Sequence, residues 1–220
     1  MYKSFVKLAI PNIVTNLTVP LVSLLDVMLM GHMNDSTYII AIGLSGAIFN
    51  MLYWAFGFLR MGTTGQVAQA FGEGADVVIK KVLVKGLTTS TLLGFAFIVL
   101  QSPILNFAKS LVDVSAYSFN LIYEYFSIRI YTAPASIILF VVNVWLMGIQ
   151  RPKLALTIAI VINVVNIIVS AVLVKSFGYG IKGVAIGTLL AQYVGLMLGV
   201  YFIFKQYSTT WLKYFKSSSR

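Results

Sequence analysis

Apolar residues follow one another in six long runs along the chain, separated by short polar segments. The runs lie at about residues 5–30, 38–59, 82–107, 117–147, 154–174 and 183–204. The second run has a polar extension to Phe71. Each run is about long enough to cross a bilayer as a helix, the open-chain structure that satisfies every backbone amide in hydrocarbon. The pattern therefore predicts an all-α polytopic membrane protein with six transmembrane helices.

The composition agrees with this pattern. Hydrophobic residues make up 59% of the 220 residues and charged residues 10%, whereas soluble chains are about 25% charged. Because cysteine is absent, thiolate metal sites, thiol nucleophiles and disulfides are excluded. With six spans there is no length for a separate soluble catalytic domain, and no nucleophile–base or metal-ligand constellation is visible. We therefore expect neither an enzyme nor a cofactor.

The net charge of +10 does not indicate a nucleic-acid partner, because the basic residues lie between the apolar runs instead of clustering on one polar segment. Lys and Arg resist translocation and stay in the cytoplasm. With the N-terminus inside, the outer loops carry only Lys109, Lys175 and Lys182. Both termini are therefore predicted to be cytoplasmic. The basic and aromatic tail, residues 206–220, is expected to lie along the inner leaflet or to begin a linker.

Asp26 is the outstanding polar residue within a span, because an ionisable group at membrane depth is costly unless it faces a cavity or a partner. It continues a polar stripe on one helical face, made by Asn12, Asn16, Ser23 and Asp26. A carboxyl group held out of water is a candidate proton carrier. The alternative is a buried carboxyl bonded to an Asn or Ser of a neighbouring helix. Pro11 and Pro20 interrupt the same helix and permit it to bend.

The fifth and sixth spans add neutral polar residues on single helical faces. These residues are Asn163, Asn166 and Ser170 in the fifth span and Thr188 and Gln192 in the sixth. With Asp26 they can line a pocket suited to a proton or to a weakly held sodium ion. The alternative is that each residue only joins helices by hydrogen bonds.

Two further features are interpreted as structural. Small residues recur every four positions in the sixth span, at Gly183, Gly187, Ala191, Gly195 and Gly199, and such a series lets another helix approach closely. Arg129, inside the fourth span, can snorkel or pair with Glu124, although a separation of five residues is poor helix-face geometry.

Several segments resemble the multidrug and toxic compound extrusion (MATE) transporters, specifically their DinF-like branch. The most specific is residues 58–65, Phe-Leu-Arg-Met-Gly-Thr-Thr-Gly. Others are Asp26-Val-Met-Leu-Met-Gly-His, Gly148-Ile-Gln-Arg-Pro, Asn163-Val-Val-Asn and Gly183-Val-Ala-Ile-Gly-Thr. The resemblance covers essentially the whole chain.

The resemblance implies an inner-membrane antiporter that exports cationic or amphipathic compounds in exchange for protons or sodium. In the family pattern the coupling residues correspond to Asp26, Asn166 and Thr188, which would also hold a sodium ion, and the bending proline corresponds to Pro11. The acid expected four residues after Asn166 is Ser170 here. Asp26 would therefore have to titrate almost alone.

Family members have two six-helix lobes, and this chain resembles the N-terminal one. The partner lobe would belong to a longer chain, a separate chain or a second copy of this chain. Membrane lipid is the other expected partner. Two alternative functions are export of a lipid-linked or polymer precursor and a non-transporting assembly or regulatory subunit.

Overall fold

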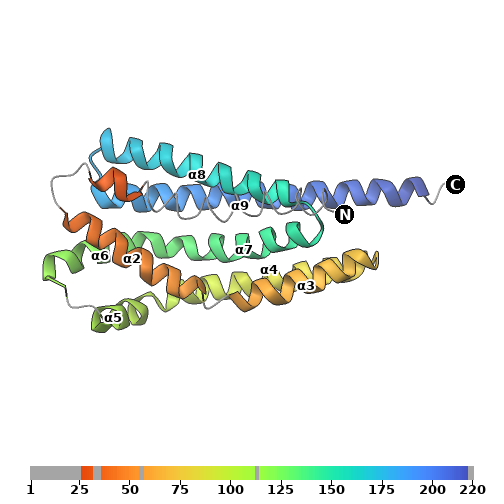
Figure 1. Ribbon diagram of the computed structural model, residues 1–220, viewed down its shortest axis with the longest axis horizontal. Helices are drawn as coiled ribbons and strands as arrows, with labels where there is room; N and C mark the ends of the chain where they lie inside the picture. Colours follow the sequence, from red (N-terminus) through yellow and green to blue (C-terminus); the bar gives the residue numbers. More distant parts are fainter. Residues whose placement is uncertain (1–25, 32–35, 55–56, 112–113, 218–220) are drawn as a thin grey trace, which may run out of the picture.

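The chain folds into a bundle of long helices (Figure 1). The computed structural model describes residues 26–31, 36–54, 57–111 and 114–217, and all regular secondary structure in these residues is helical. The helices after the short segment 26–31 are α2 (Thr37–Trp54), α3 (Gly57–Gly72), α4 (Asp76–Val99), α5 (Gln101–Leu111), α6 (Ala116–Arg129), the 3-10 turn η1 (Ile130–Thr132), α7 (Ala133–Gly148), α8 (Pro152–Lys175) and α9 (Gly180–Ser217).

Five helical stretches are long and apolar enough to cross a membrane. They are Thr37–Trp54, Asp76–Val99, Ala116–Gly148, Pro152–Lys175 and Gly180–Tyr207. The expected first span, 5–30, lies outside the described residues except for its end. The expectation of an all-α polytopic membrane protein is confirmed.

The third expected run, 82–107, differs from the structure. Helix α4 begins earlier, at Asp76, and ends at Val99, and α5 follows as a separate helix. Pro103 accounts for the break, because a proline cannot donate a hydrogen bond to the carbonyl four residues earlier, which here belongs to Val99, and its ring clashes with that group. The pattern of apolar residues does not reveal this break between α4 and α5.

The fourth run forms one long stretch with a local change of helix type. The Ser115 side chain accepts a hydrogen bond from the Ser118 backbone N–H at 3.1 Å and so caps the start of α6. Near the middle, η1 joins α6 to α7, just before Pro134. Because Pro134 has no N–H for the Ile130 carbonyl, the regular α-helical ladder is interrupted at this point.

Helices α8 and α9 pack tightly because of the small residues of α9, as the sequence pattern predicts. A Cβ added at Gly187 would collide with the Ser170 side chain and would lie 2.8 Å from the Ser170 backbone nitrogen. A Cβ at Gly195 would collide with the Ile162 side chain. The function expected of the small-residue series, close helix approach, is therefore confirmed.

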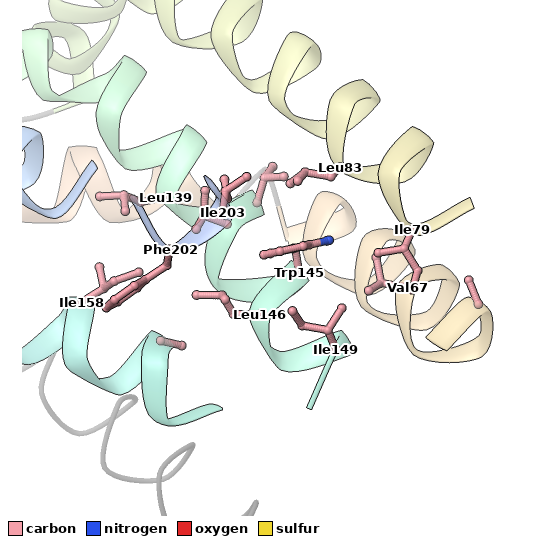
Figure 2. Packing of buried hydrophobic residues seen from close by; sticks show 14 residues of the cluster. Val67, Ile79, Leu83, Leu139, Trp145, Leu146, Ile149, Ile158, Phe202 and Ile203 are labelled. Atoms are coloured by element: carbon pink, nitrogen blue, oxygen red, sulfur yellow. The ribbon is translucent and has the colours of Figure 1, made fainter. Parts of the chain in front are cut away.

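Apolar side chains fill the part of the bundle nearest the end of α9. Figure 2 shows residues of this group, which we call the Trp145 cluster. Its labelled members are Val67, Ile79, Leu83, Leu139, Trp145, Leu146, Ile149, Ile158, Phe202 and Ile203. They come from α3, α4, α7, α8 and α9, so one apolar core holds five helices together.

A second apolar group lies towards the opposite end. It joins α2, α5, α6, the start of α9 and the segment 26–31 through Met30, Phe49, Leu105, Tyr125, Phe126, Ile181 and Val184. The Phe49 and Phe126 rings stack with their centroids 5.1 Å apart. One of its members, Tyr125, also belongs to the polar site described below.

Basic residues differ in number between the two ends of the bundle. The end that holds the α3–α4 and α7–α8 connections and the end of α9 (Figure 1) carries Lys80, Lys81, Lys85, Arg151, Lys153 and Lys205. The other end, where α2 and α9 begin, carries Lys109, Lys175 and Lys182. The charge asymmetry expected from the sequence thus has a spatial counterpart.

Candidate ion-coupling site

Asp26 lies within the helical residues 26–31, and 3% of its surface is exposed. Within the described part of the chain, its Oδ1 atom has no hydrogen-bond partner. Met30 of the same helical residues is fully buried and belongs to the same apolar group as Ile181 and Val184 of α9. A carboxyl group is therefore fixed inside the bundle with an oxygen available to a proton or a cation.

Helices α8 and α9 bring neutral polar side chains together at this level. The Asn166 side-chain amide of α8 donates a hydrogen bond to the Thr188 hydroxyl of α9 at 3.0 Å. Thr188 in turn donates to the Val184 backbone carbonyl at 3.0 Å. Asn166 Oδ1 and Ser170 Oγ have no hydrogen-bond partner among the described residues. These two buried oxygens can still accept a hydrogen bond or contact a cation.

Helix α6 contributes two residues that the sequence did not single out as functional. Arg129 donates a hydrogen bond to the Tyr125 hydroxyl at 2.5 Å, and its guanidinium lies 4.9 Å from the centre of the Phe49 ring. The buried Tyr125 side chain is also within reach of the Thr188 hydroxyl. Arg129 and Asp26 interact electrostatically, without a direct ion pair between them. The signal available in the sequence was an arginine inside a span, four residues after a tyrosine.

The expected pairing of Arg129 with Glu124 is wrong. Glu124 forms an ion pair with Lys182 of α9, with Oε1 and Nζ 3.4 Å apart, and both side chains are about half exposed. Residues five apart lie on different faces of a helix, so Glu124 points away while Arg129 faces the interior. Arg129 therefore belongs to the interior group of polar residues.

The remaining candidates have different positions. Gln192 is half-buried one turn after Thr188, and in the described residues no hydrogen bond joins it to Asn166 or Thr188. Asn163 is also half-buried and makes an interaction of its own. Pro11 and Pro20 lie outside the described residues. We use the name Asp26 cluster for Asp26, Tyr125, Arg129, Asn166, Ser170 and Thr188, in which hydrogen bonds join Arg129 to Tyr125 and Asn166 to Thr188, and Asp26 interacts electrostatically with Arg129.

The Asp26 cluster contains one carboxylate, one guanidinium and several neutral oxygens. Over the described residues, no group of three or more His, Cys, Asp or Glu side chains could hold a metal ion. An arginine side chain stays charged at any physiological pH, whereas a carboxyl group can gain and lose a proton. The arrangement therefore has a single group of variable charge, Asp26, beside a fixed positive charge.

The sequence model of the MatE family matches residues 11–172, which is most of the chain. The chain therefore belongs to the MatE family of transporters, as its motifs predict. The chain is 30% identical over 203 residues to the DNA damage-inducible protein F of Escherichia coli, and the match covers 92% of this chain and 44% of that protein. It is 25% identical to the multidrug export protein MepA of Staphylococcus haemolyticus, covering 92% of this chain and 45% of the relative.

The fold agrees with the family. A crystal structure of a MATE protein in the bent conformation superimposes with a TM-score of 0.86 at 22% identity, covering 92% of this chain and 45% of that one. This chain thus spans less than half the length of these relatives. The described helices correspond to one lobe of the two-lobed fold.

Proposed function

We propose that this chain is the ion-coupling lobe of a secondary antiporter that exports cationic or amphipathic small molecules in exchange for protons or sodium. The observation that carries the proposal is Asp26, a buried carboxyl group in a lobe of MATE fold with an oxygen that no described residue satisfies. An intramembrane carboxyl is expensive, and ion coupling is the function that such groups commonly serve.

In the proposed cycle, Asp26 alternates between its charged and neutral forms as the lobes rock between outward-facing and inward-facing states. Thr188 connects α9 to Asn166 of α8 by a hydrogen bond and lies within reach of Tyr125 of α6. A change of charge at Asp26 therefore acts on three helices through connected polar groups. Pro11 and Pro20 remain the predicted points at which the first helix bends.

The proposed location is the plasma or inner membrane, with the more basic end of the bundle in the cytoplasm. The charge asymmetry between the two ends supports this orientation, because Lys and Arg are retained on the cytoplasmic side. The terminal helix α9 extends beyond the candidate span at that end. Both termini would then be cytoplasmic.

A second six-helix lobe is proposed as the partner. The solved relative is about twice as long as the matched region, since this chain covers 45% of it. The second lobe would come from the same longer polypeptide, from a separate chain or from another copy of this one. The intact mass of the native polypeptide, compared with the mass of 220 residues, separates the first source from the other two.

The test uses the native protein, with whatever second lobe accompanies it, in inverted membrane vesicles, and it measures uptake of externally added ethidium, which corresponds to export in the cell. We expect Asp26→Asn to reduce gradient-driven ethidium transport to background, because the amide cannot change its charge. Glu73→Gln, the same change at an exposed carboxylate beside Gln69, should keep the wild-type rate. Equal amounts of both variants in the membrane, measured by immunoblotting, exclude a defect in insertion.

Wild-type transport by Asp26→Asn would contradict the proposal. If, in addition, a stable protein partner co-purified with this variant, the assembly-subunit hypothesis would replace it. Loss of a cell-envelope product with unchanged drug tolerance would instead favour export of a lipid-linked or polymer precursor.

A further inference from the structure

We propose that Arg129 is a resident counter-charge that makes the Asp26 cluster selective for protons over sodium. This inference rests on the proposed role of Asp26 as the coupling group and adds the identity of the coupling ion. It assigns the role of determining ion specificity to Arg129. This residue is not among the coupling residues expected from the sequence.

The position of Arg129 is fixed by its surroundings. Its guanidinium donates to the Tyr125 hydroxyl and lies over two aromatic rings, 4.9 Å from the centre of Phe49 and 5.2 Å from that of Tyr125. Because Glu124 is paired with Lys182, no carboxylate on its own helix neutralises Arg129. Its positive charge is therefore directed towards the interior of the lobe.

Among the residues that the structure describes, few charged or titratable groups act on Asp26. Helix α6 presents Arg129, which acts on Asp26 electrostatically, and the phenol of Tyr125, to which Arg129 donates a hydrogen bond. Helices α8 and α9 present the neutral side chains of Asn166, Ser170 and Thr188. When Asp26 is ionised, the cluster therefore carries no net charge.

A proton and a sodium ion respond differently to such a site. Sodium is held by electrostatic attraction to several oxygen ligands, so its affinity depends on the negative charge and on the ligand number of the site. Arg129 cancels the only negative charge of the cluster. A proton instead forms a covalent O–H bond with a single carboxylate oxygen and needs no shell of ligands. The cluster therefore retains a proton site and lacks the charge for a sodium site.

The test measures binding of radioactive sodium to the purified native protein in lipid nanodiscs, without any transport step. We expect no sodium binding that depends on Asp26 in the wild type. Arg129→Gln, which removes the fixed charge, should raise sodium affinity by about tenfold to a hundredfold, and this gain should disappear in the Arg129→Gln, Asp26→Asn double variant. Arg129→Lys keeps the positive charge, so it should also show no sodium binding that depends on Asp26. Arg151→Gln, which removes an exposed charge from the α7–α8 connection, is the control and should behave like the wild type.

Sodium binding by the wild type that Asp26→Asn abolishes would overturn the inference, and this comparison does not require the Arg129 variants to fold. A folded Arg129→Gln protein with no gain in sodium binding would also overturn it. Failure of the proposed function is a separate observation, namely normal ethidium transport by Asp26→Asn. The two proposals can therefore fail independently.

Discussion

The Trp145 cluster and the Asp26 cluster are both buried, but they are built from opposite kinds of side chain. The first unites five helices through close packing of apolar groups around Trp145, whose ring also stacks on Tyr207 with centroids 6.0 Å apart. The second consists of polar side chains of α6, α8 and α9 together with Asp26, and a hydrogen bond joins Asn166 of α8 to Thr188 of α9. In the second, three buried oxygens, on Asp26, Asn166 and Ser170, have no partner among the described residues.

The difference indicates that the two clusters have different roles in the lobe. In a bilayer, packing and interhelical hydrogen bonds hold helices together, because lipid removes most of the hydrophobic contribution. A well-packed apolar cluster resists rearrangement, whereas a polar cluster with unsatisfied oxygens can change its partners at small cost. We infer that the Trp145 cluster is a rigid part of the lobe and that the Asp26 cluster is the part that responds to ions.

The largest effect on stability is expected at Trp145, which is 1% exposed. Trp145→Ala should lower the free energy of unfolding by about 3–5 kcal/mol, because the surrounding helices cannot close the cavity that it leaves. Thermal unfolding in detergent measures this loss. Transport per folded molecule should stay near the wild-type value. Loss of transport without loss of stability in Trp145→Ala would contradict the inference that the Trp145 cluster is structural and the Asp26 cluster responds to ions.

The next largest effect is expected where α8 meets α9. Gly187→Ala should cost about 1–3 kcal/mol, because its Cβ collides with Ser170, including backbone atoms that cannot turn away. Gly46→Ala in α2 is the matched control, since a Cβ there meets nothing within 4 Å. Chemical or thermal unfolding of the two variants should separate them clearly. Equal stability of the two variants would show that α8 and α9 are less closely packed than the structure indicates.

A smaller effect is expected at the Asn166–Thr188 hydrogen bond. Thr188→Val keeps the shape of the side chain but removes the acceptor of the Asn166 amide, which should cost about 0.5–1.7 kcal/mol. Thr157→Val is the control, because the Thr157 hydroxyl is exposed and bonds only within its own helix. We expect the transport rate to fall in Thr188→Val alone. Loss of stability without loss of transport would show that this hydrogen bond only holds α8 and α9 together.

The smallest effect is expected at the exposed ion pair of Glu124 and Lys182. Glu124→Gln should change the free energy of unfolding by about 0–0.5 kcal/mol, because solvent screens exposed charges. Its sodium-binding behaviour should match that of the wild type. If Glu124→Gln changed sodium binding as strongly as Arg129→Gln, the separation between the surface pair and the interior arginine would be wrong.

The sequence predicted the elements that depend on local periodicity and missed those that depend on contacts between distant segments. The fourth run, 117–147, closely matches the observed stretch Ala116–Gly148, because apolar length alone identifies a span. The break before α5 was missed although Pro103 marks it. Apolar runs report composition, whereas a helix end depends on single hydrogen bonds.

In the candidate site, too, the sequence predicted what depends on local pattern and missed what depends on contacts between distant segments. Asn166 and Thr188 were singled out because each occupies a polar position within an apolar helix, and the structure joins them by a hydrogen bond. Arg129 was assigned a structural role, since its neighbours Tyr125 and Phe49 become visible only when α2 and α6 are packed together. The partner of a buried charge depends on the tertiary structure, so the pattern of residues along one sequence does not predict it.

The most direct test of the central claim is the release of protons when substrate binds. Ethidium is added to the purified native protein in weakly buffered solution, and a pH indicator records protons set free. If Asp26 carries the exchanged ion, the wild type should release protons and Asp26→Asn should release none, while Glu73→Gln should match the wild type. Equal proton release by Asp26→Asn and the wild type would contradict the account.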